Sequence, residues 1–177
     1  MSSWPARLGA RASARPSFAA VAEEHLDAVF RYLLLVTRDH ATAQDLTSET
    51  FEKAFRSWRR FDPRRSSPRT WLCRIARNAA LDHFRVEERR RRRETAYAAD
   101  APEADERSLG AEGLSPRLEA ALAELSAADR EVIALRVLLE LDGETAARVL
   151  GISRTACSTR LGRALAKLEE KVRDDDR

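Results

Sequence analysis

The stretch from Glu144 to Leu168, ETAARVLGISRTACSTRLGRALAKL, constrains the fold of this chain more than any other segment. Ala146, Ala147 and Leu150 recur at the spacing of one helical face. Gly151 can adopt the left-handed conformation that ends a helix, and Ser153 can cap the next helix. In that second helix the inward positions are Cys157, Leu161, Ala164, Leu165 and Leu168, and the outward polar positions are Arg154, Thr155, Ser158, Thr159 and Arg163. The pattern predicts a helix-turn-helix suited to a DNA major groove. A helical hairpin with a solvated polar face is the alternative.

Composition limits the remaining possibilities. The 177 residues are enough for one domain or two small ones, and 44% are hydrophobic, so a core can form. The net charge is only +3, so the clustering of the arginines matters more than the sum. Cys73 and Cys157 form no CxxC pair, which predicts neither a metal site nor a disulfide and fits a cytoplasmic protein. No apolar run approaches the roughly 20 residues of a membrane span, so no membrane insertion is expected.

Three helices are predicted in the first half of the chain. Residues 1–17 are expected to form a disordered tail, and Ser17 can cap a helix that starts at Phe18. Asp39 can cap a second helix, and Ser67 with Pro68 can start a third. The inward stripes are Val21, Leu26, Val29, Phe30, Leu33 and Leu34 in the first helix, Ala43, Leu46, Thr50, Phe51, Ala54, Phe55 and Trp58 in the second, and Trp71, Leu72, Ile75, Ala76, Ala79 and Phe84 in the third.

A change of composition at residues 95–114 predicts a flexible linker, because periodicity is lost there and Ala, Asp, Glu, Pro and Gly accumulate. The first domain is therefore placed at residues 18–94 and the second at residues 115–172, followed by a polar tail at residues 173–177. Ser115 and Ser126 are expected to cap two further helices, and Asp142 leads into the helix-turn-helix. Val132, Ile133, Leu135 and Leu139 should pack inward. Alternating strand patterns are absent, so the expected fold class is all-α, with two small helical domains.

The third predicted helix and the loop before it carry a dense basic surface. Outward positions on this helix are Arg69, Arg74, Arg77, Asn78, His83 and Arg85, and the run Arg89 to Arg93 continues them. A phosphate backbone would bind such a surface, although arginine runs also occur as plain solvated surface. Trp58 and Trp71 lie on apolar stripes and are expected in the core. Phe61, in the loop, is the better candidate for stacking on an unpaired base.

Catalysis has little support in this sequence. His25, His40 and His83 stand apart without partners at metal-ligand spacing, and no phosphate-binding glycine loop or nucleophile elbow is present. We therefore predict that the protein is no enzyme, holds no metal and uses no cofactor.

Together these segments resemble the bacterial sigma factors of the extracytoplasmic-function (ECF) group, which keep only the second and fourth conserved sigma regions. The resemblance rests on AQDLTSETFEKAFRSWRRFDP and RTWLCRIARNAALDHFR in the first half, and on LSAADREVIALR and ETAARVLGISRTACSTRLGRALAKL in the second. It implies a subunit that binds core RNA polymerase, directs it to promoters, helps melt the minus-ten element and is held inactive by an anti-sigma factor.

The resemblance also implies roles for particular residues. The second helix would dock on the clamp helices of the largest polymerase subunit through Asp45, Leu46, Glu49, Thr50 and Phe51. The minus-ten element, duplex and melted, would be contacted by Phe61, Arg64, Arg65, Arg69, Arg74, Arg77, Asn78, Asp82, His83 and Arg85. The minus-thirty-five element would be contacted by Arg154, Thr155, Ser158, Thr159, Arg160 and Arg163, and the same domain would meet the polymerase flap.

The sequence departs from the family pattern at three places. Ser126 stands where a proline is usual, and Glu140 to Gly143 replace a Gly-Leu-Ser-Tyr-like turn. Thr155 to Ser158 replace the common Gly-Thr-Val-Lys at the recognition helix, so no promoter preference can be carried over. Two other functions stay open on the residues alone: a dimeric helix-turn-helix regulator that needs no polymerase, and an RNA-binding adaptor that uses the arginine run.

Overall fold

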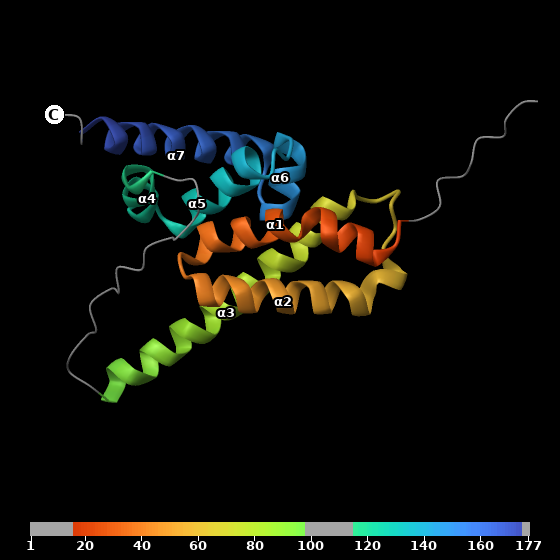
Figure 1. Cartoon of the computed structure of the whole chain (residues 1–177). Helices are drawn as coiled ribbons and strands as arrows, with labels where there is room; N and C mark the ends of the chain where they lie inside the picture. The colour runs from red at the N-terminus through yellow and green to blue at the C-terminus, as the bar shows by residue number, and fades with distance from the viewer. Residues whose placement is uncertain (1–15, 98–114, 175–177) are drawn as a thin grey trace, which may run out of the picture.

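The computed structural model describes residues 16–97 and 115–174, and within them the fold is all-α (Figure 1). No strand occurs in these two ranges. The helices are α1 (Phe18–Thr37), α2 (His40–Ser57), the short η1 (Trp58–Arg60), α3 (Pro68–Tyr97), α4 (Pro116–Ala123), α5 (Ala127–Ile133), the π-helical η2 (Ala134–Leu138), α6 (Gly143–Leu150) and α7 (Arg154–Asp174).

Local capping sets the helix starts, as predicted. The Asp39 carboxylate accepts a 2.7 Å hydrogen bond from the backbone N–H of Thr42, which satisfies one of the unpaired amides of the first turn. Five serine hydroxyls accept the equivalent hydrogen bond from a backbone N–H of the first turn, at 3.1 to 3.2 Å. They are Ser17 for α1, Ser67 for α3, Ser115 for α4, Ser126 for α5 and Ser153 for α7.

The first helical group consists of α1, α2 and α3, which pack against one another. Most of the predicted inward positions are buried or half-buried, but Leu26 is 50% exposed and Phe55 is 66% exposed. Phe55 lies about 100–120° around an ideal helix from the buried Ala43 and Ala54, beyond the edge of the core-facing stripe, whereas Leu26 lies in the first half of α1, where most side chains are not fully buried. The prediction that both point inward was wrong.

The second helical group, α4 to α7, contains the predicted helix-turn-helix. Ala146, Ala147 and Leu150 are buried, and Gly151 ends α6 in the left-handed region with φ 69°. In α7 the predicted inward residues Cys157 and Ala164 are buried, whereas Leu165 is 40% exposed, contrary to its prediction. Between η2 and α6, Glu140 also has a left-handed φ of 50°, within the turn that departs from the family sequence.

The two helical groups share one hydrophobic core. Helix α1 lies in the middle of the molecule, with α2 and α3 on one side and α5 and η2 on the other (Figure 1). From Val29 to Val36 every residue except Arg31 is buried or half-buried, so this end of α1 is covered all round.

Helix α3 ends beyond the first group. Its last described side chains, Arg89 to Glu94, are all exposed, and the helix continues to Tyr97. The first three residues of the predicted linker are thus helical, while residues 98–114 lie outside the described residues, as do residues 1–15 and 175–177 of the predicted tails.

Candidate nucleic-acid and protein interfaces

The start of α7 presents the residues predicted for a major groove. Arg154, Thr155, Ser158, Thr159 and Arg163 are all exposed, while Cys157 between them is buried. Gly151 and the Ser153 cap place this first turn immediately after α6. Arg160 differs from the other predicted residues because it is half-buried and its positive charge acts on Asp129 and Cys157. Burial raises the pKa of the Cys157 thiol, so Cys157 is a packing residue.

An ion pair fixes α7 against α5. The Lys167 ammonium donates a 2.9 Å hydrogen bond to the carboxylate of Asp129, whose side chain is only 12% exposed. Burial alone would raise the pKa of Asp129, but hydrogen bonds from Lys167 and Ser126 outweigh it and hold the pKa below its ordinary value. The recognition helix is therefore held in place by packing and by a charge-assisted bond.

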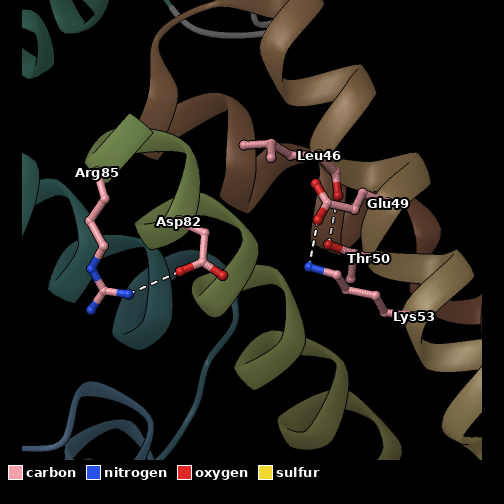
Figure 2. A network of polar contacts seen from close by, with 6 residues as sticks. All are labelled: Leu46, Glu49, Thr50, Lys53, Asp82 and Arg85. Atoms are coloured by element: carbon pink, nitrogen blue, oxygen red, sulfur yellow. Dashed lines mark hydrogen bonds and ion pairs between the residues drawn. The ribbon is translucent and has the colours of Figure 1, made fainter. Parts of the chain in front are cut away.

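One face of α3 carries exposed polar residues in a row. Arg74, Asn78, Arg85 and Arg89 are exposed and fall within about 60° of one another on an ideal helix. Asp82 flanks the row and forms a 2.9 Å ion pair with Arg85 (Figure 2). These arginines form a basic stripe that a phosphate backbone can follow. His83 is half-buried, with its ring 5.8 Å from that of Phe84.

The loop before α3 is anchored by an aromatic cluster. Phe61 is only 4% exposed, and its ring stacks on Trp58 at 4.9 Å with an interplanar angle of 7°, while the Trp71 ring lies 5.1 Å away. The expectation that Phe61 is free to stack on a base is therefore wrong for this conformation: the ring holds the loop to the core. Arg64 and Arg65 are exposed beyond it, and the Asp62 carboxylate accepts a 2.9 Å bond from the Arg64 amide.

Two arginines predicted on the outside of α3 are partly buried. The Arg77 side chain is 19% exposed and its Nε donates a 2.8 Å hydrogen bond to Glu131 of α5. Arg69 is half-buried, and its positive charge acts on Cys73. Burial raises the pKa of Cys73 to about 12 despite that charge, so Cys73 is also a packing residue.

The exposed face of α2 differs from the predicted protein interface. Asp45 is exposed, and Glu49 lies beside it in a 2.5 Å ion pair with Lys53 (Figure 2). Leu46 and Thr50 are 5% and 0% exposed, and the Thr50 hydroxyl donates to the Leu46 carbonyl, so neither side chain can touch a partner on this face. Their assignment as contact residues is wrong.

Sequence reasoning missed Phe55 on this face. Phe51 is half-buried, with its ring 6.5 Å from that of Phe18, whereas Phe55 is the most exposed large apolar side chain of the described residues. Its apolar character was counted toward the core, although its angular position alone would have placed it outside.

The described ranges, residues 16–97 and 115–174, contain neither a candidate metal site nor a candidate membrane span. There, no group of three or more His, Cys, Asp or Glu side chains could hold a metal ion. None of the helices in these ranges is long and apolar enough to cross a membrane.

Comparison with known proteins identifies the two helical groups that carry these candidate surfaces. The family model of Sigma-70 region 2 matches residues 21–90, and that of Sigma-70, region 4 matches residues 115–168. The two helical groups thus define a protein of the sigma-70 class, and we call α1 to α3 region 2 and α4 to α7 region 4.

The relatives narrow this class. The ECF RNA polymerase sigma factor BldN of Streptomyces coelicolor is 34% identical over 172 residues, which cover 95% of this chain and 65% of BldN. The ECF RNA polymerase sigma factor SigC of Mycobacterium tuberculosis is 35% identical over 149 residues, covering 84% of this chain and 79% of SigC. The chain belongs to the ECF RNA polymerase sigma factors.

One solved structure resembles the fold of this chain over both regions. The sigma factor RpoE of Bartonella quintana, in complex with the anti-sigma factor NepR, has 25% sequence identity and a TM-score of 0.74. The likeness covers 88% of this chain and 96% of RpoE.

Proposed function

We propose that this sigma factor recognises the minus-thirty-five element through α7 and recognises and melts the minus-ten element through α3 and the loop before it. Region 2 docks on the clamp helices of the largest polymerase subunit through α2, and region 4 also meets the flap. The domain limits of this proposal are residues 18–94 and 115–172.

The observation that carries the proposal is the first turn of α7. Arg154, Thr155 and Ser158 are exposed at the N-terminal end of a helix whose opposite side is buried, directly after a left-handed glycine turn. A second helix of a helix-turn-helix enters the major groove with these N-terminal positions, and arginine there can bind guanine with two hydrogen bonds.

Melting of the minus-ten element needs no catalytic step by this chain. Each base-pair step of lost stacking costs on the order of 1.4 kcal/mol, which phosphate contacts and captured single-stranded bases can offset. Arg74, Asn78 and Arg85 on α3, with Arg64 and Arg65 in the loop, supply such contacts. We therefore propose that the energy comes from binding and that the protein is no enzyme.

We also propose that an anti-sigma factor regulates the chain. The RpoE structure that it resembles was solved with the anti-sigma factor NepR, and the likeness extends over both regions. Because its partner polymerase works in the cytoplasm, we place this chain there as well.

Transcription in vitro tests the function as a whole. Core polymerase, this protein and a pool of genomic promoter fragments are expected to give discrete start sites that require the protein and share two spaced sequence elements. No start sites, combined with tight binding of duplex DNA by the protein alone, would favour the dimeric regulator instead.

The α2 surface can be tested with a charge reversal. We expect Asp45→Arg to weaken binding to core polymerase about tenfold or more, because it places a cation where the proposed interface uses an acidic face. Phe55→Ala should weaken binding in the same direction by removing the exposed apolar contact. Fluorescence anisotropy of labelled protein with core polymerase gives both affinities.

The matched control is Glu23→Arg, the same charge change at an exposed position of α1. It should leave the affinity within about twofold, as is usual for surface substitutions outside an interface. If Asp45→Arg binds as well as this control, α2 is not the docking surface.

A further inference from the structure

A cavity of about 340 Å³ lies between the start of α3 and the turn that leads into α6. Helices α3 and α6 are in contact beside it. Glu140 and Asp142, two of the residues by which this turn departs from the family pattern, belong to the cavity wall. Pockets of roughly 300–1,000 Å³ hold small organic ligands, so this cavity has room for one small molecule.

Three guanidinium groups reach the cavity from three separate segments. Arg65 comes from the loop before α3, Arg74 from the beginning of α3 and Arg148 from α6. Arg74 forms no hydrogen bond or ion pair within the described residues, and the carboxylate of Asp62 lies 3.9 Å from Nε of the exposed Arg65. Arg148 donates a 3.1 Å hydrogen bond to the Thr145 hydroxyl and keeps further N–H groups for another acceptor. The cavity therefore collects donors that suit an anion.

Two carboxylates share the cavity with these three arginines, so the wall keeps a net positive charge. Asp142 is committed to the start of α6, where it accepts bonds of 3.0 and 2.9 Å from the amides of Glu144 and Thr145. The hydrogen bonds, chiefly that from Thr145, hold the pKa of Asp142 below its ordinary value. Glu140, in contrast, forms no hydrogen bond or ion pair with the part of the chain that the structure describes. An acceptor in a basic cavity fits a ligand that carries N–H donors as well as an anionic group.

Apolar side chains complete the wall. Leu141 and Val149 are 7% and 5% exposed, and both line the cavity. Ligand pockets combine apolar surface of this kind with a few polar groups that fix the orientation of the ligand. A planar heterocycle can lie against Leu141 and Val149 while its amino group donates to Glu140 and an attached phosphate accepts from the arginines.

We propose that this cavity binds a nucleoside phosphate, with the phosphate held by Arg65, Arg74 and Arg148 and the amino group of the base donating to Glu140. Guanine suits Glu140 best, because its adjacent ring N–H and amino group can donate together to the two oxygens of one carboxylate. The proposal adds a small-molecule site to the chain and does not depend on the proposed promoter or polymerase contacts.

Isothermal titration calorimetry of the full chain with guanosine diphosphate, without divalent cations, tests this proposal. Pyrophosphate and guanosine, titrated separately, supply the phosphate and the base alone, and each should bind about tenfold more weakly or worse. Arg148→Ala should weaken guanosine diphosphate binding about tenfold through the loss of a charge-assisted hydrogen bond. Arg74→Ala, which breaks no contact within the described ranges, should act in the same direction. Glu140→Gln should weaken guanosine diphosphate binding without weakening that of pyrophosphate.

The matched control is Arg163→Ala, which removes the same charge from an exposed position of α7 outside the cavity. Its affinity should stay within about twofold of that of the unvaried chain. Equal losses in Arg74→Ala, Arg148→Ala and Arg163→Ala would overturn the site, because net charge alone would then attract the nucleotide. Pyrophosphate that binds as tightly as guanosine diphosphate would overturn the assignment of a nucleoside. Absence of binding by a chain that circular dichroism shows to be folded would overturn the whole proposal, whereas promoter recognition is measured separately by transcription.

Discussion

Asp129 shows how one side chain couples helix formation to the placement of a recognition surface. Its backbone amide is capped by Ser126 at the start of α5, and its carboxylate binds Lys167 of α7. Sequence reasoning found the cap, because Ser and Asp three residues apart are a local signal. The partner on α7 lies 38 positions away, and no local rule could predict it.

The lowered pKa of Asp129 predicts a pH-dependent contribution to stability. A carboxyl with a lower pKa in the folded state stabilises the fold above the ordinary pKa near 4, and this stability is lost as the pH falls through the folded value. We expect Asp129→Asn to lower the free energy of unfolding by about 1 kcal/mol at pH 7, because Lys167 is partly solvated and loses a charged partner. Urea unfolding at pH 7 and pH 3 measures the effect.

The difference between Asp129→Asn and the unvaried chain should shrink as the pH falls from 7 to 3, because below the ordinary pKa the unfolded state binds a proton that the folded carboxylate still resists. Glu169→Gln serves as the control, since its partner Arg173 is exposed and a surface pair contributes little. A difference that is equally large at both pH values would show that the effect arises from packing and not from the charge.

At the scale of the element, the turn between α6 and α7 depends on Gly151. Its φ of 69° is strained for any residue with a Cβ, although a Cβ there would meet no atom within 4 Å. Gly151→Ala should therefore destabilise the protein by about 1 kcal/mol through backbone strain alone. Gly162, inside α7, also has open space around it but lacks a left-handed φ.

The matched substitution Gly162→Ala should stabilise the protein by up to about 1 kcal/mol, because alanine forms helix more readily than glycine. Thermal unfolding of the two variants is thus expected to shift in opposite directions. Equal shifts of one sign would mean that the turn conformation does not control the cost.

The helices themselves were predictable from the sequence, whereas parts of the interfaces were not. Capping residues and apolar periodicity are local sequence signals, and they correctly predicted where α1, α2, α3 and α7 begin. Leu46 and Thr50 were placed on the protein interface by resemblance, yet both belong to the buried stripe. Phe55 and Leu165 were counted inward because they are apolar, yet both side chains are exposed, and the position of Phe55 around its helix already indicated this. Arg77 could not be assigned a partner because Glu131 comes from the other region.

At the scale of the whole molecule, one shared core predicts one unfolding transition. Two of the three tryptophans, Trp58 and Trp71, report on region 2, whereas circular dichroism reports on the helices of both regions. We expect the two signals to coincide during urea unfolding of the unvaried chain, as two-state behaviour requires. In Glu131→Gln they should separate, because the regions then unfold with less coupling. Separate transitions in the unvaried chain would show that the halves are independent.

The burial of the second half of α1, where only Arg31 is exposed between Val29 and Val36, has a cost if the helices around it separate. From Val29 to Val36 the helix carries apolar side chains around its circumference, and α5 and η2 cover the part that α2 and α3 leave free. A chain in which α5 and η2 separate from α1 would expose this apolar strip to water, and contiguous strips of that kind cause self-association. The packing of α5 and η2 on α1 therefore also protects the protein from aggregation, and a variant that weakens this packing should associate with another copy as its concentration rises.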